Sequence, residues 1–260
     1  MKLRAVKYRI TDKLNDVIIF LLGRRWKVIL INEYPKCGAS WLKYMLGELL
    51  EQDGYFINRR KNYLPLIKQK YFIQRHWLKH TRHVYKTIII IRDPRDVYNS
   101  FYFFENYYAA NPKKRDFYGF DVNADDKDNM YNYLKSKLIY PHKSSPRFSY
   151  ITFWDTYKNR KDICFVKYED LKKDTKGELH RILGFLGFKK NEQSILKSVE
   201  NHNLPKMKKI EKVSDDRQKL VRKGIVGEWK NYFNNDSITL AKEYLGDMIV
   251  EMGYEKSKDW

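Results

Sequence analysis

The stretch KVILINEYPKCGASWLKYMLGELL, residues 27–50, contains three features that decide the fold. Lys27–Asn32 is a short apolar run rich in β-branched residues, which is typical of a buried strand. From Ala39 onward the apolar residues recur with the period of a helix, and this pattern stops near Gly54. Only a short loop separates the two patterns. The stretch therefore predicts a strand, a tight loop and a helix in direct succession.

Two further apolar runs repeat this arrangement along the chain. Thr87–Ile91 and Ile163–Val166 contain no charged residue, as is usual for parallel strands that are covered on both faces. A helix is predicted after each run, the first beginning at Pro94 and the second covering about 175–186. Strands that alternate with helices indicate an α/β fold, a three-layer sandwich with a mainly parallel central sheet.

The remaining segments complete the expected domain. Residues 1–260 are predicted to form a single domain, with the polar stretch at about 106–145 as an insertion or lid on the acceptor side. A crossover helix is expected within Arg147–Tyr157, and an amphipathic helix over Ser237–Met252. Lys206–Arg222 is strongly polar, and we expect it to be irregular.

Composition limits the class of protein. The 260 residues include 43% hydrophobic side chains, enough to bury a core, and 52 Lys and Arg against 32 Asp and Glu. The resulting charge of +20 attracts anions, but nucleic acid, anionic membrane, glycan and phosphorylated nucleotide all fit it. Cys37 and Cys164 are too few for a disulfide scaffold, and Val17–Leu22 is too short to span a membrane. We therefore expect a cytoplasmic protein, with a basic start that favours membrane surfaces.

The loop Tyr34–Trp41 carries the strongest chemical signal. A strand that runs directly into a helix directs several free N–H groups and the positive end of the helix dipole at one point, which suits phosphate or sulfate. Gly38 allows close approach of the backbone, Lys36 adds charge and Ser40 adds a hydroxyl. The loop is not a Walker A motif, because its lysine precedes the glycine. An ordinary strand–helix turn with a solvated lysine is the alternative.

A second candidate loop, IRDPRDVYNS, follows the strand that ends at Ile91. Arg92 and Ser100 together suit a second phosphate, because a guanidinium binds phosphate oxygens in pairs. Ligands of open α/β sheets bind at the carboxyl ends of the strands, where both loops are expected. Arg95 is expected to face solvent, and the alternative for the whole loop is an exposed, arginine-rich helix start.

A third candidate is the basic loop VRKGIVGEWK, residues 221–230. Two cations stand beside two glycines in a stretch without periodicity, so this loop is suited to close over an anion. A solvated linker is the alternative.

Taken together, YPKCGASWL, IRDPRDVYNS, VKYEDLKKD and VRKGIVGEWKNYF closely resemble, in that order, the sequence marks of the PAPS-dependent sulfotransferase family. PAPS is 3′-phosphoadenosine 5′-phosphosulfate. The four segments span Tyr34–Phe233, most of the chain. The resemblance implies a P-loop-NTPase-like sulfotransferase fold. It also implies transfer of a sulfuryl group from PAPS to a hydroxyl acceptor, without a metal, leaving adenosine 3′,5′-bisphosphate (PAP).

The resemblance also implies roles by position. The 5′-phosphosulfate loop would consist of Lys36, Cys37, Gly38, Ala39 and Ser40, with Lys36 also acting in catalysis. The adenine would contact Trp41 and Tyr168. The 3′-phosphate would contact Arg92, Ser100, Arg222, Lys223 and Gly224. The chain departs from the family pattern at Cys37 and Ala39, which replace Ser and Thr, and near Leu204, where an aromatic ring often stacks on the base. Ala39 lacks the side-chain hydrogen-bond donor of Thr, but its backbone N–H remains.

Transfer to a hydroxyl needs a base, and histidine suits that role near neutral pH. The resemblance implies His76, at the end of the predicted strand Tyr71–His76, although Gln74 stands where a lysine often does. His80 and His83 are local rivals, and glycan-modifying members of the family use a carboxylate instead. The three histidines also have the spacing of metal ligands on a helix, but the predicted strand opposes that interpretation.

The acceptor has no readable signature, and a glycan, a lipid headgroup and a small alcohol remain open. Contact with an anionic membrane surface would be weak, and no specific nucleic acid is expected. Two other functions stay as alternatives. A basic nucleic-acid-binding protein would use the charge and the 6 Trp, 21 Tyr and 14 Phe, but no binding module is recognisable. A P-loop-like kinase is opposed by the order of lysine and glycine in the first loop.

Overall fold

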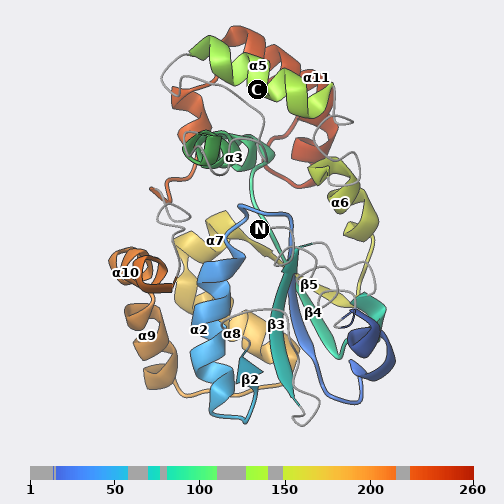
Figure 1. The fold of residues 1–260 in the computed structure, drawn as a ribbon, viewed down its shortest axis with the longest axis vertical. Coiled ribbons are helices and arrows are strands. Elements are labelled where there is room, and N and C mark those ends of the chain that lie inside the picture. The colour runs from blue at the N-terminus through green and yellow to red at the C-terminus, as the bar shows by residue number, and fades with distance from the viewer. Residues whose placement is uncertain are drawn as a thin grey trace. The chain divides into compact units, whose positions relative to one another are not determined.

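The computed structural model describes most of the chain and divides it into two compact units (Figure 1). The described residues are 14, 16–57, 70–76, 81–109, 127–139, 149–214 and 223–260. The sheet unit comprises residues 1–91 and 160–206, and the helical unit comprises residues 92–159 and 207–260.

A five-stranded sheet forms the centre of the sheet unit. Its strands are β1 (Ile29–Glu33), β2 (Phe56–Ile57), β3 (Tyr71–His76), β4 (Lys86–Ile91) and β5 (Ile163–Lys167). Their order is β2-β3-β1-β4-β5, and every neighbouring pair is parallel. The predicted α/β fold with a parallel sheet is confirmed. Because the strands are parallel, the segments that follow β1, β3, β4 and β5 all leave the same edge of the sheet.

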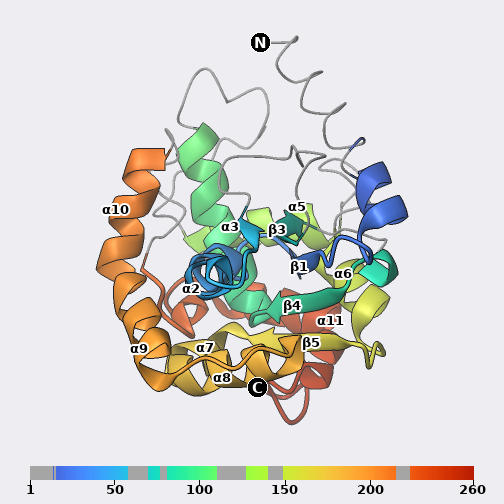
Figure 2. The same cartoon turned by 90° about the horizontal axis from the view of Figure 1, so that it is seen from below.

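Helices cover the sheet within this unit. They are α2 (Ala39–Glu51), the short η1 (Thr81–His83), α7 (Tyr168–Lys173), α8 (Thr175–Leu186) and α9 (Glu192–Asn201). α2 packs against β1, β2, β3 and α9, and α8 packs against β5. A helix over residues 16–22 lies on the opposite side of the sheet from α2 (Figures 1 and 2). Its Ile19 is fully buried against Leu30 and Ile73, so both faces of the central strands are apolar.

The helical unit has its own core. Its elements are α3 (Pro94–Ala109), α5 (Lys127–Leu138), α6 (Tyr150–Tyr157), η3 (Glu228–Asn231) and α11 (Asn235–Glu251). α5 packs against α3 and α11 around a core rich in aromatic rings, among them Tyr102, Tyr133 and Trp229. These buried rings account for part of the high aromatic content of the chain.

Two segments differ in detail from the sequence-based expectation. The prediction that Lys206–Arg222 is irregular was wrong for its first half, because α10 covers Leu204–Ser214 and buries Met207. In proteins most of the stability of a helix comes from burial of its apolar face rather than from the propensity of its residues. Within the expected insertion at 106–145, α5 buries Met130 and Leu134. The single-domain interpretation and the lid stay predictions.

Candidate active site

The loop between β1 and α2 has the geometry of an anion site. Lys36 and Gly38 both adopt left-handed backbone conformations, with φ of 75° and 100°. Gly38 caps α2 without a side-chain hydrogen bond, and the first turn of α2 contains no acidic residue. A backbone that turns in this way exposes consecutive N–H groups at the positive end of a helix, which is how proteins bind phosphate and sulfate. The predicted strand, loop and helix are confirmed.

The other loop residues divide into buried and accessible groups. Cys37 and Ala39 are buried, with exposed fractions of 0% and 1%, whereas Lys36 and Ser40 are partly exposed. The two departures from the family pattern therefore face the protein interior, where their effect is on packing. The Ala39 N–H donates to Glu33 Oε2 at 3.1 Å. The role of Ala39 toward the donor stays a prediction.

The residues assigned to the adenine lie together. Trp41, in the first turn of α2, and Tyr168, at the start of α7, have ring centroids 6.1 Å apart at 65°. Trp41 Nε1 donates to the carbonyl oxygen of His202 at 2.8 Å, which orients the indole. Tyr168 also lies against the loop between β1 and α2, residues 34–38, which we call the anion loop. A Cβ at Gly38 would lie 2.7 Å from the Cδ2 atom of Tyr168. Leu204 is half-buried at the start of α10.

The candidate base, His76, is the last residue of β3, and its side chain is 54% exposed. Its nearest described charged partner is Glu33, whose Oε1 lies 3.3 Å from His76 Nδ1. The same Oε1 accepts a hydrogen bond of 2.6 Å from Gln74 Nε2. The Glu33 side chain is only 4% exposed. A buried carboxylate therefore contacts both His76 and the backbone of Ala39, the first residue of α2.

Sequence reasoning missed Glu33. Its signal was a carboxylate at the end of an apolar strand, directly before the anion loop. A buried carboxylate is rare unless it has hydrogen-bond or charged partners, so a glutamate at this position predicts such a partner close by.

The other described histidines have different surroundings. The His83 ring packs against Phe20 at 4.1 Å, and His180 lies 3.1 Å from Glu192 on the surface. His202 Nδ1 donates to the Ser198 carbonyl oxygen in the preceding turn of α9 at 2.9 Å. His80 and His142 lie outside the described residues. In the part of the chain that the structure describes, no three His, Cys, Asp or Glu side chains are grouped as metal ligands would be.

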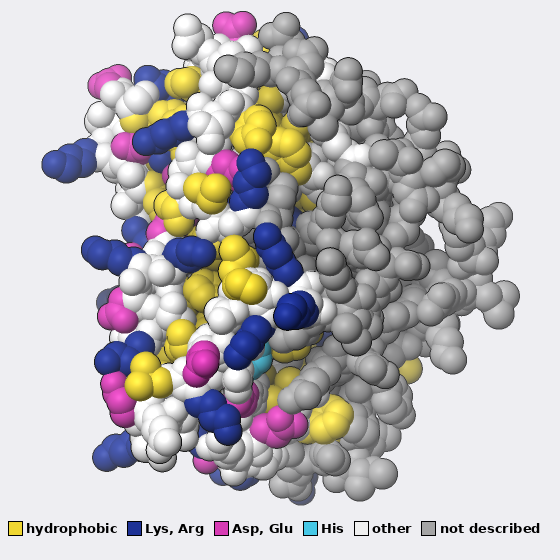
Figure 3. Space-filling view, turned by 90° about the vertical axis from the view of Figure 1, so that its left-hand side faces the viewer, with side chains coloured by type: hydrophobic (Ala, Val, Ile, Leu, Met, Phe, Trp, Pro, Cys, Tyr) yellow, Lys and Arg dark blue, Asp and Glu magenta, His cyan; other side chains and the backbone are white. Residues whose placement is uncertain are grey.

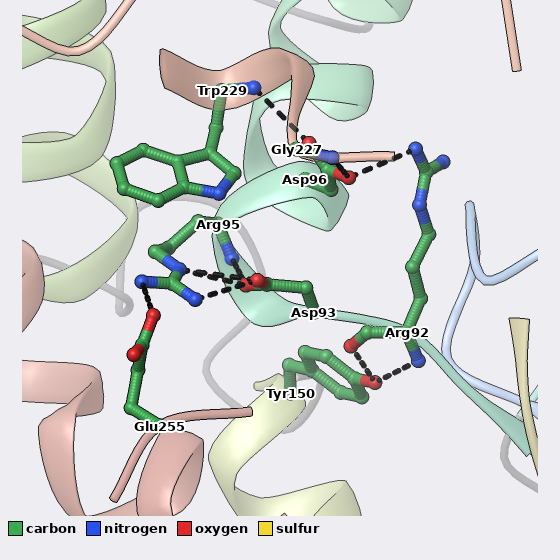
Figure 4. Close-up of polar contacts among 8 residues, drawn as sticks. All are labelled: Arg92, Asp93, Arg95, Asp96, Tyr150, Gly227, Trp229 and Glu255. Carbon is green, nitrogen blue, oxygen red and sulfur yellow. Dashed lines mark hydrogen bonds and ion pairs between the residues drawn. The ribbon is translucent and has the colours of Figure 1, made fainter. Parts of the chain in front are cut away.

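A second group of candidate residues belongs to the helical unit (Figure 4). Arg92 follows β4 directly, and its Nη2 donates to the Ile225 carbonyl oxygen at 3.1 Å and lies 3.4 Å from Asp96 Oδ2. The Tyr150 hydroxyl accepts from the Arg92 N–H at 3.0 Å and donates to its carbonyl oxygen at 2.8 Å. Tyr150 therefore holds the Arg92 backbone in place. Ser100, two turns along α3, is partly exposed.

Asp96 connects this loop to the late basic loop. Its carboxylate accepts from the Gly227 N–H at 2.8 Å and from the Trp229 N–H at 3.1 Å. Burial raises the pKa of Asp96, against the opposing effect of Arg92 and these hydrogen bonds. Gly227 lies 131 positions away from Asp96, so local sequence gave no signal for this contact, and the function of Asp96 as the anchor of the late loop was missed.

The late basic loop is described from Lys223 onward, and Arg222 lies outside the described residues. Lys223 Nζ pairs with Glu228 at 3.2 Å, and hydrogen bonding to that carboxylate raises the pKa of Lys223. Gly224 has a left-handed φ of 64°. Arg92 binds the carbonyl oxygen of Ile225, the residue after Gly224, so the structure brings these two candidate segments together.

Arg95 corrects one expectation. It was expected to face solvent, yet it is only 3% exposed. Its guanidinium binds Asp93 at 2.7 Å and Glu255 at 2.7 Å. It also lies over the rings of Trp229 and Trp260, with its central carbon 4.3 and 4.2 Å from their centroids. The neighbouring Asp93 and three distant residues, Glu255, Trp229 and Trp260, stabilise the buried charge, and local sequence does not reveal the distant contacts.

These features define a class of protein first. A parallel α/β sheet, whose central strand leads through a left-handed, glycine-containing loop into a helix, is a P-loop-like nucleotide-binding architecture. The profile of one family, the sulfotransferase domain, matches residues 27–259. The chain therefore belongs to the sulfotransferase domain family and is a sulfotransferase.

Curated relatives and solved structures agree with this assignment. Sulfotransferase 2A1 of Macaca fascicularis is 29% identical over 278 aligned residues, covering 96% of this chain and 87% of that protein. Human sulfotransferase 1C2 is 23% identical, covering 79% of this chain and 77% of that protein.

Two solved structures confirm the fold. Mouse sulfotransferase SULT7A1, complexed with PAP, is similar with a TM-score of 0.67 and 22% identity, covering 92% of this chain and 91% of that one. Retinol dehydratase, in complex with androsterone and inactive cofactor PAP, is similar with a TM-score of 0.62 and 17% identity, covering 92% of this chain and 85% of that one.

None of the helices in the described ranges is long and apolar enough to cross a bilayer.

Proposed function

We propose that this sulfotransferase transfers the sulfuryl group of PAPS to a hydroxyl acceptor, with His76 as the general base. The observation that carries the proposal is the left-handed loop at Lys36 and Gly38, which begins α2 without a side-chain cap and lies beside Tyr168. The similar mouse structure contains PAP, which is the product that PAPS leaves after transfer.

The donor is proposed to bind through groups from several segments. Lys36, Ser40 and the backbone of the loop bind the 5′-phosphosulfate, where the lysine charge opposes the negative charge of the anion. Trp41 and Tyr168 contact the adenine. Arg92, Ser100 and the loop at Arg222, Lys223 and Gly224 bind the 3′-phosphate. Of these, Arg92 offers the strongest single contact, because a guanidinium forms paired hydrogen bonds with phosphate oxygens.

The reaction is an in-line displacement at sulfur. The acceptor hydroxyl oxygen forms a bond to sulfur while the bond from sulfur to the 5′-phosphate oxygen breaks, and PAP leaves with that electron pair. The hydroxyl proton passes to His76. Lys36 and the loop N–H groups offset the negative charge that develops on the leaving phosphate. The protein supplies position and charge, and every reacting atom comes from the donor, the acceptor and the base.

For the acceptor we propose a small alcohol among the three classes left open, the others being a glycan and a lipid headgroup. Retinol and androsterone, named with the structurally similar retinol dehydratase, are both small alcohols. A cytoplasmic location and weak contact with an anionic membrane surface stay predictions.

The direct test is calorimetry of PAP binding in the presence of excess EDTA, followed by transfer of labelled sulfate from PAPS to a panel of alcohols, sugars and lipids. We expect PAP to bind without a divalent metal and label to pass to at least one alcohol. Loss of all binding on chelation would show that a metal holds the donor, and binding without transfer to any acceptor would argue against the proposed reaction.

One further measurement distinguishes the proposed function from its two alternatives, a nucleic-acid-binding protein and a P-loop-like kinase. Among the described residues on the face drawn in Figure 3, Lys and Arg side chains are interspersed with Asp and Glu, whereas a nucleic-acid-binding protein gathers its cations in a patch or stripe. Thermal stabilisation by PAP, by ATP with magnesium and by an oligonucleotide ranks the three ligands. We expect PAP to raise the melting temperature most.

A further inference from the structure

We propose that Glu33 is a positioning residue for His76, which fixes the tautomer of the base and joins it to the anion loop. This inference rests on the proposed function and deepens it. Glu33 lies in the loop's own strand, so it is placed to act on the base without contributing to the chemistry itself.

The contact follows from the register of the sheet. In the parallel pair of β1 and β3, Glu33 lies directly opposite His76. Side chains two residues apart on a strand share a face, so Gln74 and His76 both reach Glu33. Gln74 donates to Glu33 Oε1 at 2.6 Å, and His76 Nδ1 lies 3.3 Å from the same oxygen. The register alone therefore brings the carboxylate to the imidazole.

The nitrogen that faces the carboxylate decides the proton's position. A carboxylate accepts hydrogen bonds, so it favours the tautomer with hydrogen on Nδ1. The Nε2 lone pair is then left to take the acceptor's proton. The same division of roles operates in the Ser-His-Asp triad, where the carboxylate orients the imidazole and stabilises its charged form. The Glu33 side chain is 4% exposed and the His76 side chain is 54% exposed. The buried carboxylate therefore holds an imidazole that reaches solvent.

The second carboxylate oxygen extends this link to the donor site. Glu33 Oε2 accepts from the Ala39 N–H at 3.1 Å, at the first residue of α2. One buried side chain thus contacts the first turn of the anion-loop helix and the base. Holding both groups in one geometry lowers the entropy lost when donor, acceptor and base align.

The test compares the full-length protein with three variants: Glu33→Gln, Glu33→Asp and the control Glu192→Gln. Glu192 is matched to Glu33 because it also faces a histidine, with Oε2 3.1 Å from His180 Nε2, but it lies on α9 and is exposed. Turnover and KM for PAPS, the Kd for PAP, the melting temperature and the ¹⁵N spectrum of His76 are measured for each. The spectrum reports which imidazole nitrogen carries the proton.

We expect Glu33→Gln to lower turnover by about 10- to 100-fold, less than complete loss of the base. We expect the Kd for PAP to change by less than about threefold, and the His76 spectrum to shift toward a mixture of tautomers. Glu33→Asp keeps the charge on a shorter side chain and should recover part of the turnover. Glu192→Gln should match the wild type in turnover and in the His76 spectrum.

A double variant tests whether Glu33 acts only through His76. If Glu33 acts only through His76, then Glu33→Gln combined with His76→Ala is no slower than His76→Ala alone. The positioning role would be overturned if the two losses of turnover multiplied in the double variant. An unchanged His76 spectrum in Glu33→Gln would overturn it as well. A dead Glu33→Gln beside an active His76→Ala would overturn it too, because Glu33 would then be the base. If the wild type transfers no sulfate, the proposed function fails, and the spectrum of the same variants still decides the inference.

Discussion

Gly38 and Tyr168 are packed so closely that no side chain fits between them. A Cβ at Gly38 would lie 2.7 Å from Cδ2 of Tyr168, and the φ of Gly38 is 100°. Both backbone conformation and space therefore require glycine at this position. The contact joins the loop after β1 to the start of α7, so the anion loop and the Tyr168 ring share one packing arrangement.

Gly38→Ala should therefore weaken PAP binding and lower stability by about 1–3 kcal/mol, because alanine is strained at positive φ and its methyl group displaces Tyr168. Gly54→Ala is the matched control: its φ is 78°, but nothing lies within 4 Å of a Cβ there. It carries the strain without the clash. Calorimetry with PAP and thermal unfolding separate the two effects. Equal PAP affinities for the two variants would show that the Tyr168 contact is irrelevant to binding.

Replacing His76, the proposed base, should reduce turnover and leave donor affinity intact. His76→Ala removes the proton acceptor, so we expect turnover to fall by about 10²–10⁴-fold while the Kd for PAP stays near the wild-type value. His83→Ala and His180→Ala are controls, since His83 packs on Phe20 and His180 pairs with Glu192. Turnover is measured with an acceptor found in the panel. Near-normal turnover of His76→Ala would rule it out as the base.

Arg92→Ala should affect donor binding, whereas Arg95→Ala should affect the stability of the fold. Arg92→Ala should weaken PAP binding by about 1.5–3 kcal/mol, because a charged hydrogen-bond pair to the 3′-phosphate is lost. Arg95→Ala leaves Asp93 and Glu255 without their buried partner, so stability should fall by about 3–5 kcal/mol. Calorimetry measures the first effect and urea unfolding the second, with the exposed Arg25→Ala as control. A stable Arg95→Ala variant would contradict the described core.

Asp96 predicts a dependence of stability on pH. Burial raises the pKa of Asp96 above its ordinary value of 3.8, so the folded state binds this proton more tightly than the unfolded state does. The stability contributed by the protonated form is present below that ordinary value and is lost as pH rises through the raised pKa. We expect the unfolding free energy of the wild type, relative to Asp96→Asn, to fall as pH rises above the ordinary pKa of 3.8 and through the raised pKa. A difference that grows with pH would contradict this prediction.

Much of the fold could be predicted from the order of short segments. The apolar runs within Lys27–Asn32, Thr87–Ile91 and Ile163–Val166 each contributed a parallel strand, because an apolar run of that length is stable only when both faces are covered. The anion loop was predictable for a related reason. A strand that turns directly into a helix needs a glycine and leaves N–H groups exposed, and both properties are local.

Contacts between distant residues were not predictable in the same way. Glu33 reaches His76 because of strand register, and Asp96 reaches Gly227 across 131 positions. Arg95 is buried because Trp229 and Trp260 enclose it, although its own neighbours in sequence suggested an exposed helix start. Sequence alone determined the strand–loop–helix units and the residue types at the candidate site, since these depend on local backbone geometry and periodicity. Only the tertiary structure decided which carboxylate meets which cation or imidazole, because pairing depends on packing between segments far apart in the chain.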